Sequence, residues 1–197
     1  MSMKINNVLS LFDGISCGQI ALNRSGIQYN NYYASEIDKN AIKVTQHNYP
    51  NTIQLGDVRF VNTSILNDID LLIGGSPCEG FSYAGDMLNF NDPRSKLFFE
   101  FVRIKNEIKP KYFLMENVWM KKQWVDIITK ELGVEPILIN SNLVSGQERK
   151  RYYWTNIPIN GLPSNKNIHI HDIIGKDKYY GAIRGRKING NDFYTQV

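Results

Sequence analysis

Short apolar runs alternate with helix-like segments along the first 157 residues, and this alternation constrains the fold more than any other feature. Residues 7–12, 70–74 and 112–115 have the length and the flanking turns of buried strands. Residues 94–108 have the apolar spacing of an amphipathic helix. The alternation predicts an α/β fold with a doubly wound, mostly parallel sheet and helices on both faces. Further strands are expected at 29–35, 53–55 and 134–140, and further helices at 19–24, 39–48 and 123–132.

The last part of the chain follows a different pattern. From residue 161 to residue 197, Gly, Asn, Lys and Tyr occur without sustained periodicity. A length of 197 residues corresponds to one domain or slightly more, at ~100–200 residues per domain. The sequence therefore predicts one α/β domain over residues 1–157 and the beginning of a second, smaller unit over residues 158–197.

Positive charge is concentrated in the last quarter of the chain. Residues 1–146 hold 14 Lys and Arg against 15 Asp and Glu, whereas residues 147–197 hold 9 against 4. A basic segment attached to a near-neutral domain favours an anionic partner, with nucleic acid as the first candidate. A solvated basic tail is the alternative that the charge pattern alone leaves open.

The composition argues against several classes of protein. Hydrophobic residues make up 42% of the chain and charged residues 21%, as in globular proteins. No uncharged apolar run approaches the ~20 residues that span a bilayer, and the N-terminal residues contain no signal-peptide core. The 2 cysteines are too few for a disulfide scaffold. Membrane, secreted, collagen-like and disordered proteins are therefore disfavoured, and a reducing, cytoplasmic location without a membrane partner is expected.

The first three predicted strands are each followed by glycine or acidic residues. In an open α/β sheet this edge binds ligands, and an acidic residue after the second strand reaches ribose hydroxyls. Glu36 has that place, about 20 residues after a glycine-rich turn. Capping of the next helix by Ser35 or Asp38 is a second interpretation that can hold at the same time. The pattern predicts an adenosine-containing cofactor, with Phe12, Asp13, Gly14, Gly18, Glu36, Ile37, Asp57 and Val58 as candidate ligands.

The fourth and fifth predicted strands are followed by groups that can do chemistry. Cys78 comes after Pro77 in a segment with several glycines. A free cysteine is commonly a buried small hydrophobe, but these polar and glycine neighbours favour a nucleophile. Cys17 follows the glycine-rich turn and is expected to pack behind it. Glu116 comes directly after a buried-type strand, where a carboxyl group can act as an acid.

Six segments resemble the motifs of the DNA (cytosine-5-)-methyltransferase family and occur in the family's order. They are Phe12-Asp13-Gly14 with Gly18, Glu36, Asp57, Pro77-Cys78, Glu116-Asn117-Val118, and Gln147-x-Arg149-x-Arg151. The amino-acid sequences of these segments are most similar to the de novo animal-type branch of the family and to short phage enzymes. The resemblance covers residues ~7–157. It adds the motif Gln147-x-Arg149-x-Arg151 to the strand-end residues above. The resemblance implies a Rossmann-like fold of the methyltransferase type, S-adenosyl-L-methionine as cofactor with Pro77 beside it, no metal, and double-stranded DNA as substrate, in a phage or a restriction-modification system.

The resemblance also implies a role for each catalytic residue. The Cys78 thiolate adds to carbon 6 of a flipped-out cytosine, so that carbon 5 becomes nucleophilic. Glu116 binds ring nitrogen 3 and the exocyclic amine, while Arg151 and, more distantly, Arg149 hold the thiolate or the base carbonyl. The loop over residues 81–93 is expected to close over the base. Further substrate contacts are expected from Ser82, Asn117, Gln147, Arg184 and Arg186.

Full-length members of that family continue with a target-recognition domain and two further motifs. Residues 158–197 are therefore expected to be the start of an incomplete target-recognition region. A fragment, a split product that a second polypeptide completes, and a degenerate enzyme all remain open. If the basic segment faces DNA, replacing Arg184, Arg186 and Lys187 together should flatten the salt dependence of binding.

Two other functions are compatible with the core motifs. One is methylation of tRNA by the same chemistry, and the other is a non-catalytic remnant that binds cofactor or DNA. A generic Rossmann dehydrogenase is excluded because the sequence lacks G-x-G-x-x-G after its first strand.

Overall fold

A computed structural model of the chain describes residues 4–77 and 96–174. The chain divides into two compact units. The first comprises Met1–Ile139 and Lys150–Asn160, and the second comprises Asn140–Arg149 and Gly161–Val197. The domain boundary predicted between residues 157 and 158 stays a prediction. Within the described ranges, none of the helices has both the length and the apolar character that crossing a bilayer requires.

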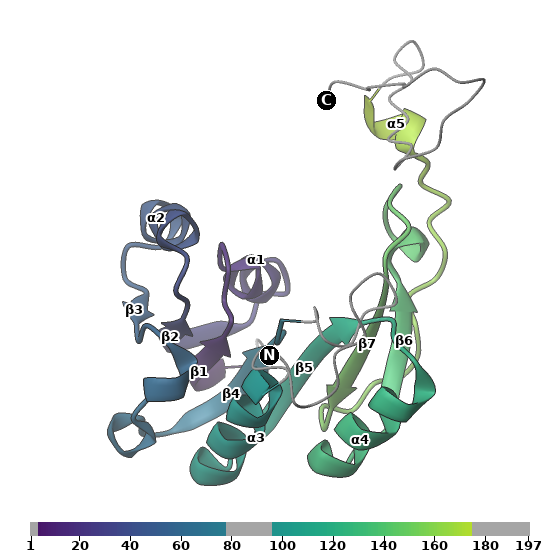
Figure 1. The fold of residues 1–197 in the computed structure, drawn as a ribbon. Coiled ribbons are helices and arrows are strands. Elements are labelled where there is room, and N and C mark those ends of the chain that lie inside the picture. Colours follow the sequence, from purple (N-terminus) through teal and green to yellow (C-terminus); the bar gives the residue numbers. More distant parts are fainter. Residues whose placement is uncertain (1–3, 78–95, 175–197) are drawn as a thin grey trace, which may run out of the picture. The chain divides into compact units, whose positions relative to one another are not determined.

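Among the described residues, seven strands form one sheet with the order β3-β2-β1-β4-β5-β7-β6 (Figure 1). The strands β1 to β5 pair in parallel, and β7 is antiparallel to β5. The predicted doubly wound, mostly parallel sheet is therefore confirmed. The strands are β1 (Lys4–Leu11), β2 (Gln28–Ser35), β3 (Ile53–Gln54), β4 (Ile69–Gly74), β5 (Tyr112–Val118), β6 (Pro136–Asn140) and β7 (Lys150–Thr155).

Helices cover both faces of the sheet, with α1 and α2 on one side and α3 and α4 on the other (Figure 1). Their bounds are α1 (Cys17–Arg24), α2 (Lys39–Asn48), α3 (Lys96–Ile108) and α4 (Lys122–Leu132). Two short 3-10 turns, η1 (Val58–Phe60) and η2 (Thr63–Ile65), connect β3 to β4. All four predicted helices in this unit are present, and α2 has the predicted bounds because Asp38 caps it, accepting hydrogen bonds from Asn40 N and Ala41 N.

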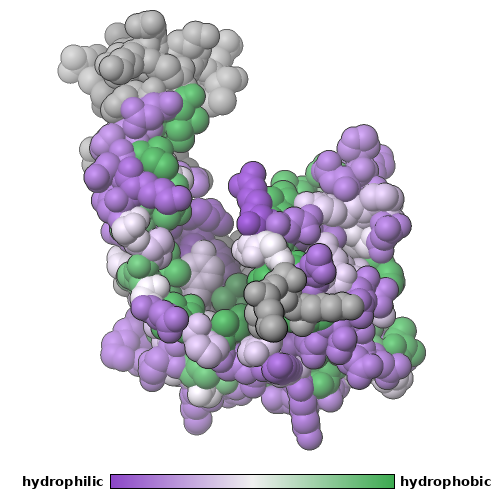
Figure 2. All heavy atoms as spheres, turned by 180° about the vertical axis from the view of Figure 1, so that it is seen from behind, coloured by the Kyte–Doolittle hydropathy of each residue, from purple (hydrophilic) through white to green (hydrophobic). Residues whose placement is uncertain are grey.

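Two hydrophobic cores lie on the two faces of the sheet. Successive residues of a strand point to opposite faces, and accordingly Val8 and Leu9 of β1 belong to different cores. The larger core joins the strands to α3 and α4 through residues such as Phe101 and Ile128, and the smaller one joins them to Leu22 of α1. Seen from behind, the outer surface mixes hydrophilic and apolar side chains, as folded proteins generally do (Figure 2).

The strand β7 is the main difference from the sequence-based expectation, which placed no strand there. Its sequence begins with Lys150 and Arg151, and of its six residues only Trp154 is buried. The segment therefore lacks the apolar run that marked the other strands. In the structure β7 lies between β5 and β6, although it is the last of the three in sequence. The strand β5 also extends through Val118, three residues past the predicted end, because it pairs with β7 there.

The second unit contains the 3-10 turn η3 (Ser141–Leu143) and the short helix α5 (Ile170–Ile174). Lys166 N donates a hydrogen bond of 2.8 Å to the carbonyl oxygen of Leu143. A Cβ at Gly146 would lie 2.8 Å from Ile170 N, so glycine permits a close approach of two backbone segments. The helix α5 lies in the stretch where the sequence showed no sustained periodicity.

Candidate functional site

Four strands end side by side, and their register brings the candidate residues together. Leu11 at the end of β1 pairs with Ser35 of β2 and with Gly74 of β4. Gly74 pairs in turn with Met115 of β5. The next residues on these strands are Phe12, Glu36, Gly75 and Glu116. Because the strands are parallel, these four residues occupy neighbouring positions at the carboxyl edge of the sheet, where this fold binds ligands.

The turn after β1 has an unusual backbone that binds the Glu36 carboxylate. Phe12, Gly14 and Ser16 have φ values of 58°, 59° and 60°, in the left-handed region. Alternation of this kind turns backbone N–H groups toward one point and favours an anion there. Gly14 N donates to Glu36 Oε2 at 2.8 Å, and Ile37 N and Asp38 N donate to Oε1 at 2.7 and 2.8 Å. Three backbone donors therefore hold the carboxylate at the end of β2.

Asp13 stabilises the same turn from inside. Its carboxylate accepts hydrogen bonds from the Tyr32 hydroxyl at 2.9 Å and from the Ser16 hydroxyl. Burial and the nearby Asp13 charge raise the pKa of the Tyr32 hydroxyl far above its usual value, so Tyr32 remains a donor. Both carboxylate oxygens of Asp13 thus bind protein groups, and a cofactor contact for Asp13 stays a prediction. The role of Tyr32 had no signal in the sequence.

Gly18 is required by packing in this structure. A Cβ at this position would lie 2.4 Å from Ile73 Cδ1 and 2.6 Å from the Tyr32 hydroxyl oxygen. Glycine therefore lets α1 approach β2 and β4 closely. These distances do not test the predicted contact of Gly18 with a cofactor, which stays a prediction.

The prediction that Cys17 packs behind the turn is wrong, because Cys17 is exposed. It is the first residue of α1, whose buried residues are Gln19 and Leu22. At 3.6 residues per turn, two positions correspond to a rotation of about 200° around the helix axis. Burial of Gln19 therefore turns Cys17 toward solvent.

A cavity of about 350 Å³ lies at the ends of the first four strands. Six of the predicted cofactor residues line it, namely Phe12, Glu36, Ile37, Asp57, Val58 and Pro77. Its other lining residues are Ser35, Gly56, Arg59 and Leu97. Leu97 enters from α3, and no motif in the sequence indicated that this helix reaches the pocket. The structure thus brings together residues from the ends of four strands in one mainly apolar pocket, with the carboxylates of Glu36 and Asp57 in its wall.

Arg59 holds the Asp57 carboxylate. Its Nη2 lies 2.5 Å from Asp57 Oδ2, its Nε lies 3.0 Å from both carboxylate oxygens, and its backbone N donates to Oδ1 at 3.0 Å. Hydrogen bonding from the Arg59 side chain lowers the pKa of Asp57 below its usual value. The Arg59 guanidinium also lies 5.6 Å from the centre of the Phe60 ring. Arg59 was not among the predicted residues, although it follows two of them directly.

Glu116 forms an ion pair across the β5–β7 ladder. Arg151 Nε lies 2.8 Å from Glu116 Oε1, and the two side chains are 17% and 31% exposed respectively. A Cβ at Gly75 would lie 3.0 Å from Glu116 Oε2, so glycine leaves room for the carboxylate beside the β4 end. The pairing of Glu116 with Arg151 was missed because the sequence did not predict β7.

Asn117 follows Glu116 in β5 and is 1% exposed. Its Nδ2 donates to the hydroxyl oxygen of Ser76 at 3.2 Å, and its Oδ1 accepts from Val118 N at 2.8 Å. Asn117 therefore ties the residue before Pro77 to β5. The predicted substrate contact of Asn117 stays a prediction.

The remaining candidates are distributed over other parts of the chain. Gln147 and Arg149 belong to the second unit. There Ser141 Oγ donates to the Gln147 carbonyl oxygen at 2.6 Å, and Arg149 N donates to Asn140 Oδ1 at 3.0 Å. Cys78, Ser82, Arg184 and Arg186 lie outside the described residues. Within residues 4–77 and 96–174, no group of three or more His, Cys, Asp or Glu side chains could hold a metal ion.

The model of one protein family, C-5 cytosine-specific DNA methylase, matches residues 6–132, more than half of the chain. The chain belongs to this family. It is 43% identical over 113 residues to the orphan methyltransferase M.SPRI of Bacillus phage SPR, an alignment that covers 56% of this chain and 26% of that protein. It is 42% identical over 121 residues to the Type II methyltransferase M.Eco47II of Escherichia coli, covering 60% and 28%. The aligned part thus spans about a quarter of the length of these curated relatives.

Solved structures share the fold of this chain. A crystal structure of an E. coli prophage-encoded DNA modification methyltransferase has a TM-score of 0.62 at 30% identity, covering 76% of this chain and 45% of that one. The Entamoeba histolytica methyltransferase EhMeth has a TM-score of 0.66 at 19% identity, covering 83% and 57%, and shows the fold alone. The family match includes Glu36, Asp57 and Glu116, whereas the segment from Gln147 to Arg151 lies beyond it.

Proposed function

We propose that this chain is the catalytic part of a DNA cytosine methyltransferase, which transfers a methyl group from S-adenosyl-L-methionine to carbon 5 of a flipped-out cytosine. One observation carries the proposal. The cavity that contains Glu36 and Asp57 reaches Pro77, the residue before Cys78, and the Glu116–Arg151 ion pair lies at the adjacent strand ends. A cofactor pocket and a base-binding group therefore converge on the start of the segment that carries the nucleophile.

The cavity fits the cofactor in size and in chemistry. Its volume of about 350 Å³ is within the range of small-molecule pockets. Glu36 would accept hydrogen bonds from the ribose hydroxyls, and Ile37, Val58 and Leu97 provide apolar surface for the adenine ring. Asp57 would accept a hydrogen bond from the exocyclic amine. When bound, S-adenosyl-L-methionine supplies an electrophilic methyl group on its sulfonium.

The chain's own residues prepare the cytosine. The Cys78 thiolate forms a bond to carbon 6, and the electron pair of the 5,6 double bond makes carbon 5 nucleophilic. One Glu116 oxygen accepts from the exocyclic amine, and the other exchanges a proton with ring nitrogen 3 as charge develops there. Arg151 orients Glu116. After methyl transfer to carbon 5, a base takes the carbon 5 proton, and the electrons of that C–H bond restore the 5,6 double bond as the Cys78 thiolate leaves carbon 6.

Covalent trapping tests the central step. Duplex DNA of mixed sequence with 5-fluorocytosine should form a stable adduct with the chain in the presence of the cofactor, because fluorine at carbon 5 cannot leave as a proton does. Cys78→Ala should abolish the adduct, and Cys17→Ala should retain it as the matched control. An adduct that needs Cys17 instead would reverse the assignment, and no adduct with any form would favour a non-catalytic remnant. A parallel reaction with tRNA that contains 5-fluorocytosine tests the alternative that the chain methylates tRNA.

Cofactor binding is tested by isothermal titration with Glu36→Gln and Glu36→Ala. Hydrogen bonds to a charged group contribute about 1.5–3 kcal/mol, so the Kd should rise by about 10–100-fold. Glu131→Gln removes an exposed carboxylate from α4 and serves as the control. Unchanged affinity in both Glu36 variants would remove Glu36 from the site.

The biological setting is part of the same proposal. The similarity to a phage orphan methyltransferase and to a Type II methyltransferase supports DNA as the substrate, and with it a role in restriction-modification or phage DNA methylation in the cytoplasm of a bacterial cell. The predicted second polypeptide stays a prediction.

A further inference from the structure

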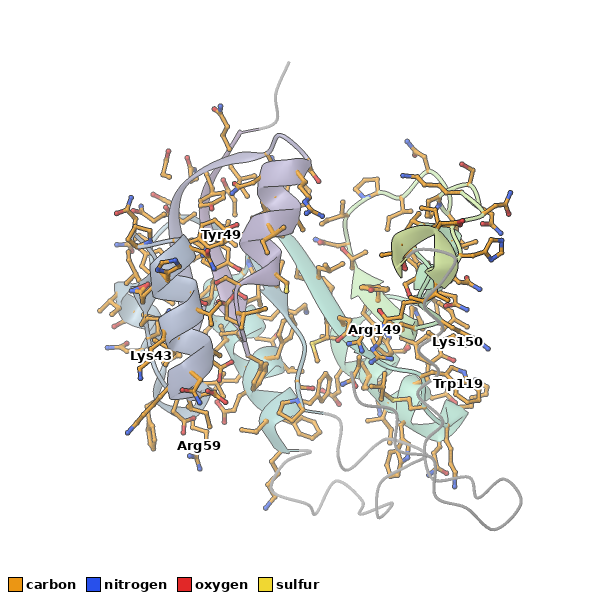
Figure 3. All side chains as sticks on the ribbon, turned by 90° about the horizontal axis from the view of Figure 1, so that it is seen from above. Lys43, Tyr49, Arg59, Trp119, Arg149 and Lys150 are labelled. Atoms are coloured by element: carbon orange, nitrogen blue, oxygen red, sulfur yellow. The ribbon has the colours of Figure 1, made fainter. Side chains whose placement is uncertain are left out.

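Trp119 and Lys150 flank the last residue pair of the β5–β7 ladder. The antiparallel register pairs Glu116 with Tyr153 and Val118 with Arg151. Trp119 follows Val118 in the chain and Lys150 precedes Arg151, so the two residues lie next to the last pair of this ladder. Figure 3 labels both residues, which project on the same side of that view.

This aromatic and basic pair is open to solvent. Trp119 is 48% exposed, whereas the other two tryptophans of the chain, Trp124 and Trp154, are 8% and 0% exposed. Lys150 is exposed as well. Tryptophan is normally well buried, and an exposed one beside a cation has the chemistry that binds a nucleic-acid strand: a π face for a base and a charge for a phosphate.

The pair lies close to the residues that would hold the flipped base. Trp119 follows Glu116 by three residues, and at about 3.3 Å per residue of extended chain their backbone positions are about 10 Å apart. That distance equals the rise of about three nucleotides of one DNA strand. Lys150 is the chain neighbour of Arg151, the partner of Glu116.

We propose that Trp119 and Lys150 bind the DNA strand that flanks the target cytosine, with Trp119 stacking on an unpaired or unstacked flanking base and Lys150 pairing with a phosphate. This inference rests on the proposed function and extends it, because it assigns a strand-binding surface outside the base pocket. Flipping a base out leaves its neighbours without a stacking partner, and an exposed indole can take that place.

The affinity for a labelled mixed-sequence duplex, measured by fluorescence anisotropy, tests the proposal. Trp119→Ala should raise the Kd by about 5–100-fold, and Trp119→Phe should restore most of the affinity because it keeps an aromatic face. Lys150→Gln should reduce the slope of log K against log salt by about 0.9, the contribution of one phosphate contact. Lys130→Gln at the far end of α4 and Ile65→Ala on η2 are the matched charge and apolar controls.

Intrinsic fluorescence gives a second measurement. Since Trp119 is the exposed tryptophan, most of the quenching by bound duplex should disappear in Trp119→Phe while binding persists. Unchanged affinity in Trp119→Ala together with an unchanged salt slope in Lys150→Gln would overturn the inference, as would a chain that binds no duplex. Adduct formation with 5-fluorocytosine DNA is scored separately: an adduct with unchanged Trp119→Ala affinity would overturn only the strand contact, whereas absence of the adduct would overturn the proposed function.

Discussion

The proposed cofactor side of the sheet edge, around Glu36, and the proposed catalytic side, around Glu116, hold their carboxylates in different ways. On the cofactor side, Glu36 accepts three backbone hydrogen bonds from the turn after β1 and from its own next two residues. On the catalytic side, Glu116 is held by the side chain of Arg151, which reaches it from another strand. The first arrangement depends on local backbone conformation. The second depends on the pairing of β5 with β7, far apart in sequence.

This difference has consequences for how each side tolerates change. Backbone donors are fixed by the turn and are not removed by a side-chain substitution. A cross-strand ion pair is lost when either partner is replaced, and a partly buried charge then loses part of its compensation. The catalytic side should therefore be more sensitive to single side-chain substitutions, and the cofactor side more sensitive to changes in backbone packing.

The largest expected effect follows from Arg151→Met. Loss of the guanidinium removes the ion pair that we propose orients Glu116, and removal of one such electrostatic contact costs about 10²–10³-fold in rate. The initial rate of adduct formation with 5-fluorocytosine DNA is the measurement. Arg151→Lys should recover part of the rate, because a lysine restores the charge without the guanidinium geometry. A rate within fivefold of the unmodified chain would show that the ion pair does not support catalysis.

A second prediction concerns backbone packing on the cofactor side. In Gly18→Ala the new methyl group meets Ile73 and Tyr32, and overpacking of this kind costs about 1–3 kcal/mol. Thermal unfolding should show a Tm lower by roughly 2–12 °C. Gly75→Ala is the matched change on the catalytic side, where the new methyl meets the Glu116 carboxylate, the end of a flexible side chain. It should lower the Tm much less and should slow adduct formation instead. Equal decreases in Tm for Gly18→Ala and Gly75→Ala would show that the two sides do not differ in their sensitivity to backbone packing.

The smallest effect is expected from Arg59→Gln. Because Arg59 lowers the folded-state pKa of Asp57 below 3.8, this carboxylate binds fewer protons in the folded chain than in the unfolded chain. Its contribution to stability is therefore complete above pH 3.8 and disappears as the pH falls through the lower folded value. In Arg59→Gln that contribution is missing. The variant should thus be slightly less stable than the unmodified chain at pH 7, because exposed pairs contribute little, and the two stabilities should converge as the pH falls. Urea unfolding between pH 2 and pH 7 measures this, and identical pH profiles would contradict it.

The sequence predicted the grouping of Phe12, Glu36 and Asp57 well for a physical reason. Buried parallel strands are apolar runs, and the residues after them must lie at one edge of the sheet. Phe12, Glu36 and Asp57 could therefore be grouped from the strand pattern alone. The helical phase of α1 could not be predicted in the same way, because a buried glutamine, Gln19, faces the sheet and the exposed cysteine does not.

The catalytic side was harder to predict because it depends on a non-local pairing. The segment KRYYWT of β7 begins with two cations and buries only Trp154, so it has no strand signature of its own. It forms a strand because it pairs with the open edge of β5. Glu116 could be assigned from its place after an apolar run, but its partner could not be identified without that pairing.

The position of β7 also sets an order for assembly during synthesis. β6 is made before β7, yet it can join the sheet only through β7, which lies between it and β5. In a nascent chain that ends before residue 150, β6 has no strand to pair with and the edge of β5 stays unpaired. Such a state is prone to strand exchange and aggregation. Closing that half of the sheet requires contacts distant in sequence, which form slowly. We therefore expect burial of the Trp154 indole, which donates to Thr129 Oγ1 in the finished fold, to be among the last events of folding.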